Sequence, residues 1–174
     1  MTAADVYDSF ALYGSGVTLV AVGDGDQDRF FVAASVLTAS VDPFTVAVSV
    51  GRDRDALAPM TSGVGWSMSL LAARHADLVR HLTAGPRQRR REALELAGAQ
   101  RSPEGSLWLP DALVTLWCTT RSSVPIGDQL LLIGDVVRSS DPNRDEPLLR
   151  WNRDFVTTAD LAERELLAER YRVS

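Results

Sequence analysis

Short runs of β-branched and apolar residues, separated by turn-forming residues, most constrain the fold of this chain. Runs of this length and composition predict strands. They occupy residues 16–22, 30–34, 44–50, 65–71, 113–119 and 129–137. The Gly- and Asp-rich stretch 23–29 predicts a hairpin turn, and the small residues 35–40 with the Asp42-Pro43 pair predict a break before the third strand. The polar turn containing residues 124–128 predicts that the last two runs pair.

The sequence contains fewer helical patterns than predicted strands. Leu and Val recur at helical spacing over 73–83 and 87–97, with Ala84-Gly85-Pro86 between them. A short helical turn is expected at 56–61, a charged loop at 142–147, a last extended piece within 148–155 and a helix over 160–171. Many short strands that seldom alternate with full helices favour a mainly β fold, an antiparallel barrel with flanking helices.

The length of 174 residues, with 45% hydrophobic and 24% charged residues, predicts one domain over residues 1–174. The net charge of −5 argues against a nucleic-acid or anionic-lipid partner. Acidic residues stand near the N-terminus where a signal peptide needs basic ones, and no apolar run approaches a membrane span, so a cytoplasmic location is expected.

Few side chains of the usual catalytic types are present. All 18 basic residues are Arg, which excludes a P-loop lysine or a Schiff-base lysine. One cysteine and two histidines exclude the common zinc sites within one chain, so no metal is expected. Cys118 lies in an apolar run and is interpreted as a buried, inert thiol. Any chemistry should therefore come from a cofactor.

Two sequence features, an arginine cluster and a tryptophan, each allow both a structural and a functional interpretation. The cluster Arg87, Arg89, Arg90 and Arg91 is able to meet a phosphate or a nucleic-acid backbone, but a solvated helix start is the favoured interpretation. Trp151 is retained among the four tryptophans as a candidate for stacking on a ring.

Several motifs, in order and at matching separations, resemble those of the flavin reductase-like proteins with an FMN-binding split β-barrel. They are Ser15-Gly16-Val17-Thr18, Phe30 to Val36 followed by Ser40-Val41-Asp42-Pro43, Gly127-Asp128-Gln129 ahead of Leu131 to Val136, and Pro147-Leu148-Leu149 leading to Asn152 to Phe155. The resemblance covers about residues 7 to 156. It implies a split β-barrel, antiparallel and Greek-key-like, that forms a homodimer.

The resemblance also implies a cofactor site. The flavin ring would lie against residues 31–35, and its phosphate and ribityl chain against residues 49–56. The implied cofactor-contacting residues are Phe31, Val32, Ala33, Ala34, Ser35, Ser49, Val50, Gly51, Arg52, Arg54, Asp55, Ala56, Ser69 and Gln129. The nicotinamide side would be closed by Trp151, Asn152, Arg153, Asp154 and Phe155. No catalytic side chain is expected, because hydride transfer between stacked rings is chemistry of the cofactors.

The first functional hypothesis is therefore an NAD(P)H-dependent flavin reductase that uses FMN or FAD and supplies reduced flavin to a partner monooxygenase. The chain departs from the family pattern at Phe30-Phe31-Val32, where Gly-Met-Thr is common, and at Gln129, where His is common. It also departs at Arg54-Asp55-Ala56, where Ser and Thr or Arg and Ser are frequent, and at Ser69, where Asn is usual. These departures motivate an alternative, a non-catalytic flavin-binding or interaction protein with the same barrel. A heme or deazaflavin ligand is a third possibility.

Overall fold

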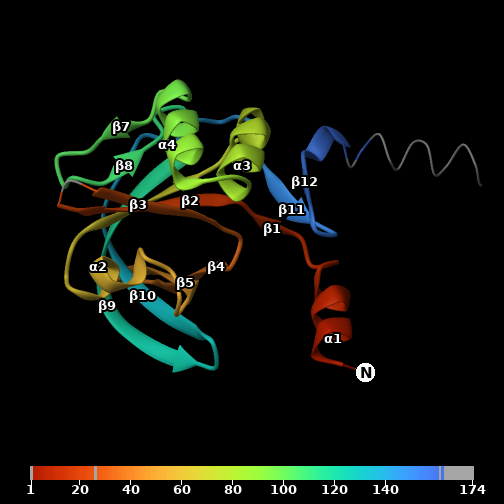
Figure 1. Cartoon of the computed structure of the whole chain (residues 1–174), viewed down its shortest axis with the longest axis horizontal. Helices are drawn as coiled ribbons and strands as arrows, with labels where there is room; N and C mark the ends of the chain where they lie inside the picture. The colour runs from red at the N-terminus through yellow and green to blue at the C-terminus, as the bar shows by residue number, and fades with distance from the viewer. Residues whose placement is uncertain (1, 26, 161, 163–174) are drawn as a thin grey trace, which may run out of the picture.

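A seven-stranded antiparallel sheet forms the centre of the computed structural model, which describes residues 2–25, 27–160 and 162 (Figure 1). The strand order in the sheet is β3-β2-β6-β9-β10-β5-β4. The strands are β2 (Thr18–Asp24), β3 (Gln27–Ala33), β4 (Val36–Val41), β5 (Phe44–Gly51), β6 (Trp66–Leu70), β9 (Val114–Ile126) and β10 (Gln129–Ser139).

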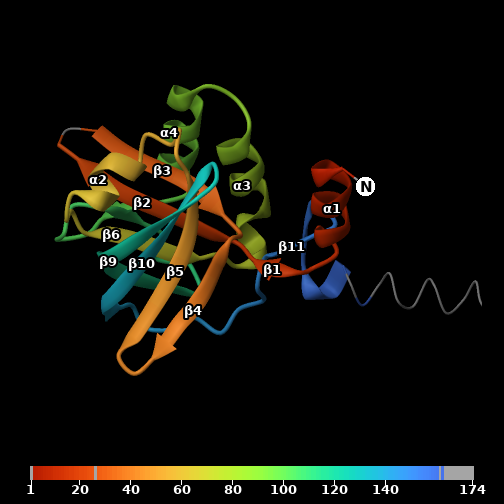
Figure 2. The ribbon, with the colours of Figure 1, turned by 90° about the horizontal axis from the view of Figure 1, so that it is seen from below.

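The two edge strands of this sheet are neighbours in the chain. β3 ends at Ala33 and β4 begins at Val36, so three Cα steps, at most about 11 Å, join opposite edges of the sheet. A flat sheet of seven strands would hold its edges much farther apart, so this one must curl round until they meet. The curled sheet is visible from below in Figure 2. The predicted antiparallel split barrel is confirmed.

The inside of the barrel is filled with apolar side chains. Trp66, Met68 and Leu132 are fully buried there, together with Cys118. The indole Nε1 of Trp66 donates to Thr120 Oγ1 at 3.1 Å, so its polar atom is satisfied. The interior is therefore a packed core, and ligand space has to be sought outside it.

A second core lies between the sheet and its covering helices. Leu19 of β2 packs with this outer core while Val20 packs inside the barrel, as the alternation of side chains along a strand requires. The cover consists of a 3-10 turn η1 (Ala73–His75), α3 (Ala76–Thr83) and α4 (Arg87–Leu96), which lie over β2 and β3 (Figure 1). These elements confirm the helices predicted over 73–83 and 87–97.

Smaller elements complete the fold. The short helix α2 (Leu57–Thr61) confirms the helical turn predicted at 56–61. A three-stranded sheet has the order β1-β11-β12, and β7 pairs with β8. The bounds are β1 (Ser15–Gly16), β7 (Gln100–Arg101), β8 (Leu107–Trp108), β11 (Leu149–Trp151), β12 (Asp154–Val156) and the N-terminal helix α1 (Ala3–Phe10). Among the described residues, no helix has both the length and the apolarity to span a bilayer.

Several predicted boundaries were wrong. The turn predicted over 23–29 is shorter, because β2 runs to Asp24 and β3 already begins at Gln27. The break predicted at Asp42-Pro43 is confirmed as a turn, but most of the small-residue stretch 35–40 before it is strand β4, which was not predicted because its side chains are largely exposed. β9 continues to Ile126, through most of the turn predicted around 124–128.

Neither helix at the ends of the chain confirms a prediction. α1 was not predicted; a capping box between Thr2 and Asp5 begins it. The helix predicted over 160–171 lies almost entirely outside the described residues.

Candidate functional site

A cavity of about 660 Å³ opens where the β3–β4 link meets the end of β5. Its volume is within the range of small-molecule and cofactor sites. Its walls are β3 with the link, the end of β5 with the following loop, the start of α4, and the β11–β12 hairpin. The lining residues are Tyr7, Asp28, Arg29, Phe30, Phe31, Val32, Ala33, Ala34, Ser35, Ser49, Val50, Gly51, Asp53, Arg54, Asp55, Thr83, Arg87, Arg90, Gln129, Arg150 and Phe155.

The floor of the cavity is flat, apolar and edged with backbone polar groups. Phe31 and Ala33 are buried, and small side chains follow them at Ala34 and Ser35. In the sheet β3 pairs only with β2, so the N–H and C=O groups on its other side have no strand partner. Such a surface suits a planar heterocycle, whose face needs apolar contact and whose rim needs hydrogen bonds.

Part of the positive charge in the cavity wall is neutralised. Arg29 pairs with Asp24 at 3.2 Å and with Asp55 at 3.1 Å. Arg87 lies 3.6 Å from the same oxygen of Asp55. Two guanidinium groups therefore compensate the Asp55 carboxylate, which does not oppose an anionic ligand.

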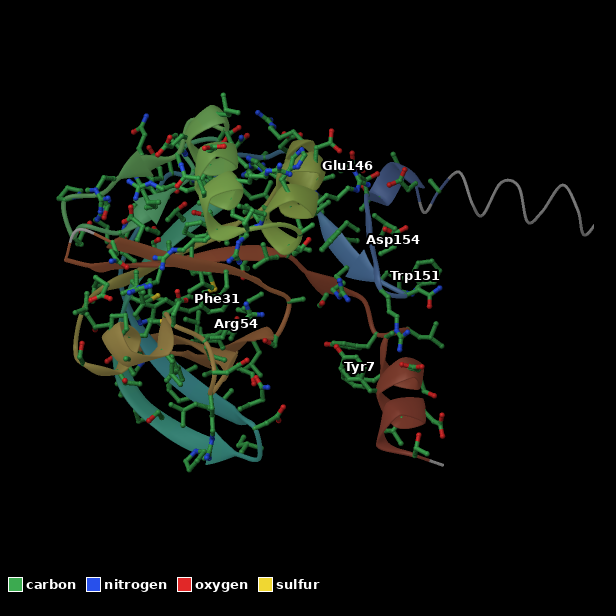
Figure 3. All side chains as sticks on the ribbon, in the orientation of Figure 1. Tyr7, Phe31, Arg54, Glu146, Trp151 and Asp154 are labelled. Carbon is green, nitrogen blue, oxygen red and sulfur yellow. The ribbon has the colours of Figure 1, made fainter. Side chains whose placement is uncertain are left out.

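Two other arginines of the cavity lie over aromatic rings. The guanidinium carbon of Arg54 is 5.9 Å from the ring centroid of Phe31, and that of Arg150 is 5.4 Å from the centroid of Phe155. Neither guanidinium is paired with a carboxylate in the described part of the chain. Figure 3 shows Arg54 beside Phe31 at the mouth of the barrel, well away from Trp151 and Asp154. These two charges remain available to a phosphate.

The cavity lies within the region that a known family shares. The model of the flavin reductase like domain matches residues 10–159. The chain belongs to this family. The matched region contains every lining residue of the cavity except Tyr7.

Individual relatives agree with the family. An NADH:riboflavin 5′-phosphate oxidoreductase of Streptomyces pristinaespiralis is 34% identical over 157 residues, covering 86% of this chain and 85% of the relative. The reductase component of 4-hydroxyphenylacetate 3-monooxygenase from Thermus thermophilus is 28% identical over 149 residues, covering 85% of this chain and 91% of the relative. The structure of the NADH:FAD oxidoreductase SgcE6 of Streptomyces globisporus C-1027, in complex with NAD and FAD fragments, aligns with a TM-score of 0.79 and 23% identity over 88% of this chain and 90% of that chain. This structural likeness shows the shared fold.

Most of the residues to which the family resemblance assigned a cofactor contact lie together in the cavity wall. They are Phe31, Val32, Ala33, Ala34, Ser35, Ser49, Val50, Gly51, Arg54, Asp55 and Gln129. They come from β3, the β3–β4 link, β5 with its following loop, and the start of β10. Their contact with a flavin stays a prediction.

Three residues of the same prediction lie elsewhere. Ala56 is buried in the barrel core. The hydroxyl of Ser69 is fully buried, shares a hydrogen bond of 2.8 Å with Thr115 Oγ1 and accepts one from the backbone N–H of Leu109 at 3.3 Å. Arg52 is exposed outside the cavity wall, its Nε 3.5 Å from the carbonyl oxygen of Gln129. Ala56 and Ser69 are therefore buried in the packed interior and do not line the cavity.

Of the residues predicted for the nicotinamide side, Phe155 lines the cavity and the others form the turn that carries it. Trp151 pairs with Asp154 across the β11–β12 hairpin. Asn152 and Arg153 have positive φ values of 48° and 67°, as the central residues of a tight hairpin turn do. The indole of Trp151 donates to the carbonyl of Leu12 at 3.2 Å, and Arg153 pairs with Asp8. This turn therefore holds the N-terminal segment.

Other cavity residues were missed from the sequence. Asp28, Arg29, Phe30, Asp53, Thr83, Arg150 and Tyr7 line it without having been singled out as site residues. Arg87 begins α4 and is exposed, which agrees with the favoured interpretation of a solvated helix start, but Arg87 and the half-buried Arg90 also line the cavity. Arg91 does match that interpretation, since it is exposed and pairs with Glu95.

Two reactive residue types lie outside the cavity. Burial raises the pKa of the Cys118 thiol from 9.0 to about 12, so the nucleophilic thiolate is scarce at neutral pH. His75 is buried, accepts from the N–H of Ala72 at Nδ1 and lies 3.1 Å from Asp111 through Nε2. In the described ranges no three His, Cys, Asp or Glu side chains converge on a possible metal site.

Proposed function

We propose that this protein is an NAD(P)H-dependent flavin reductase. The observation that carries the proposal is the cavity of a flavin reductase family barrel, in which an apolar edge-strand floor adjoins unpaired arginines. A flavin bound there would accept hydride from a reduced nicotinamide stacked on its ring. The oxidoreductase and reductase-component relatives support the same activity.

The residues present fit a flavin. The ring would lie on the Ala33–Ser35 floor, with Ser49 and Val50 beside it and Gln129 near its edge. The phosphate would be held by Arg54 and by the backbone after Gly51. A Cβ at Gly51 would lie 2.8 Å from Oδ1 of the exposed Asp53, so a larger residue there would require the Asp53 side chain to move.

The protein's own contribution is orientation and exclusion of water. Phe155 and Arg150 line the cavity from the β11–β12 hairpin, where a nicotinamide ring would approach the flavin. None of the cavity side chains has to give or take a proton for a hydride to pass between two stacked rings. A cavity without a histidine or cysteine in its wall is compatible with this chemistry.

We further propose that the protein works as a homodimer in the cytoplasm and supplies reduced flavin to a monooxygenase. The name of the Thermus thermophilus relative supports a monooxygenase partner. Exposed apolar side chains on β4 and β5, Leu37, Val41 and Phe44, support a self-association surface. Sedimentation velocity checks the dimer; a single species of 18.9 kDa would contradict it.

The activity is tested by following NADH and NADPH oxidation by the purified protein with FMN, FAD and riboflavin supplied separately. We expect oxidation that depends on both protein and flavin. Protein that binds flavin without oxidising either nicotinamide would instead favour the non-catalytic alternative, to which the departures at Val32 and Gln129 point. Absence of both binding and oxidation would overturn the proposal.

A further inference from the structure

Two buried polar atoms of the cavity wall have no hydrogen-bond partner among the described residues: Asp28 Oδ1 and Arg90 Nε. Asp28 is 4% exposed, and its other oxygen accepts from Arg101 Nη2 at 2.8 Å. Buried polar atoms without partners are uncommon in native proteins and call for an explanation. One orphan is an acceptor, the other is a donor, and both line the same cavity.

These atoms lie toward the end of the cavity that is remote from the ring floor. Asp28 stands five residues before Ala33 along β3, which is about 17 Å of extended strand. The start of α4 is fixed at this end because Arg87 Nη2 donates to the carbonyl oxygen of Asp28 at 2.9 Å. Thr83, from the end of α3, lines the cavity as well. We call Asp28, Thr83, Arg87 and Arg90 the distal wall.

A flavin mononucleotide bound on the floor would have no second phosphate to place against the distal wall. Its single phosphate is provided for by Arg54 and the loop after Gly51. The carboxylates near the distal wall are compensated, Asp28 by Arg101 and Asp55 by Arg29 and Arg87, so a second phosphate meets little repulsion. Arg90 has no carboxylate partner in the described structure and retains its charge for such a group.

We propose that the distal wall binds the adenylate half of a dinucleotide. An adenylate offers both kinds of group that the orphaned atoms lack: phosphate oxygens that accept from Arg90, and ribose hydroxyls or an amino group that donate to Asp28. This inference rests on the proposed flavin reductase function. Two substrates of that reaction carry an adenylate, the flavin dinucleotide FAD and the nicotinamide dinucleotide.

The decisive comparison is Arg90→Ala against Arg91→Ala. Both substitutions remove an arginine from α4, but Arg91 pairs with Glu95 outside the cavity. We expect Arg90→Ala to raise the KM of the dinucleotide by about ten- to a hundredfold, the usual effect of losing a charged hydrogen bond. Arg91→Ala should leave it unchanged. Thermal unfolding of both variants checks that they are folded.

Separate KM measurements for FAD, FMN and NADH identify which dinucleotide is bound. If FAD occupies the wall, Arg90→Ala raises the KM for FAD and leaves those for FMN and NADH unchanged. If the nicotinamide dinucleotide occupies it, the KM for NADH rises with FMN as acceptor. An equal change for FMN and FAD with no change for NADH, or no change in any KM, would overturn the proposal.

Binding of AMP provides a readout that does not depend on activity. Calorimetric titration of AMP into the flavin-free protein should show binding to the native chain and to Arg91→Ala, and loss of binding in Arg90→Ala. If no flavin is reduced but this AMP pattern is found, the proposed function fails and the adenylate site stands. Flavin reduction without the AMP pattern and without the KM shift leaves the function standing and refutes the site.

Discussion

Ser35 and Ser49 are joined by two hydrogen bonds that fix the floor of the cavity. The hydroxyl of Ser35 donates to the carbonyl of Ser49 at 3.0 Å, and the backbone N–H of Ser49 donates to the carbonyl of Ser35 at 3.1 Å. Ser35 belongs to the link between the two edge strands, and Ser49 belongs to β5. The pair therefore sets where the edges of the sheet meet and where a bound ring would rest.

Replacing Ser35 by Ala should loosen this floor without unfolding the protein. Only the hydroxyl bond is lost, at a cost of about 1 kcal/mol or less in this exposed position, because the backbone bond remains. We expect a small drop in melting temperature and a clear rise in the KM for flavin. Calorimetry and flavin titration measure the two effects, and a flavin affinity equal to that of the native chain would show that the hydroxyl does not order the floor.

Arg54 and Arg52 form a matched pair for locating the flavin phosphate. Both are exposed arginines of the loop after β5, but Arg54 lines the cavity and Arg52 does not. Arg54→Ala should raise the KM for FMN about ten- to a hundredfold, since a charged hydrogen bond is lost, and leave that for riboflavin, which lacks the phosphate, unchanged. Arg52→Ala should change neither. Steady-state kinetics with both flavins decides, and equal losses with riboflavin would argue against a phosphate role.

Gly134 should be intolerant of any side chain. A Cβ at this position of β10 would lie 2.5 Å from Cζ2 of Trp66, which is fully buried in the barrel core. Gly134→Ala should therefore cost about 1 to 3 kcal/mol of unfolding free energy, or more if the core cannot shift. Gly16→Ala, with nothing within 4 Å of the added Cβ, is the control. The urea midpoint of Gly134→Ala should be lower than that of Gly16→Ala. Similar midpoints would mean that the core side chains can shift to accommodate the added methyl group.

Cys118 should make the protein less stable at alkaline pH. Its pKa is raised by burial from 9.0 to about 12, so above pH 9 the unfolded chain loses the thiol proton while the folded chain keeps it. The folded state then binds more protons, and its stability falls as the pH rises from 9 toward 12. This loss should be missing in Cys118→Ala.

Thiol labelling checks the same property at lower pH. Folded protein at pH 8 should react with a thiol reagent far more slowly than protein unfolded in urea. Rapid labelling of the folded chain, or alkaline unfolding curves that run parallel for the native chain and Cys118→Ala, would contradict the shift.

Strands with strongly apolar sequences were predictable, whereas the exposed strand β4 and helix α1 were not. The run 44–50 became β5 because its side chains are buried, so hydrophobicity and structure coincide. β4 was missed because an edge strand with exposed side chains needs no apolar pattern; its backbone pairing with β5 holds it. Helix α1 carries exposed side chains too, and contacts of the following segment with the β11–β12 turn anchor it.

The cavity could be predicted from sequence only where one segment supplies a whole wall. Residues 31–35 and 49–51 are such segments, and the resemblance found them. Arg87 and Arg90 reach the cavity because α4 packs on α3, which contacts β3, and because Arg87 donates to the carbonyl of Asp28 in β3. A local run of arginines carries no information about that contact. The prediction that Ser69 contacts the cofactor failed for a similar reason. The Ser69 hydroxyl bonds to Thr115, which is distant in the sequence, so the sequence does not reveal this contact.

The two-residue link between β3 and β4 would make the stability of the fold depend on the flavin concentration. A flavin resting on this link touches both edges of the sheet at the point where the barrel closes, so it would bind the closed barrel and not the opened one. By mass action, a ligand at free concentration L then adds RT ln(1 + L/Kd) to the free energy of unfolding. The cell's flavin level would in this way set how long the protein survives, as well as how fast it turns over.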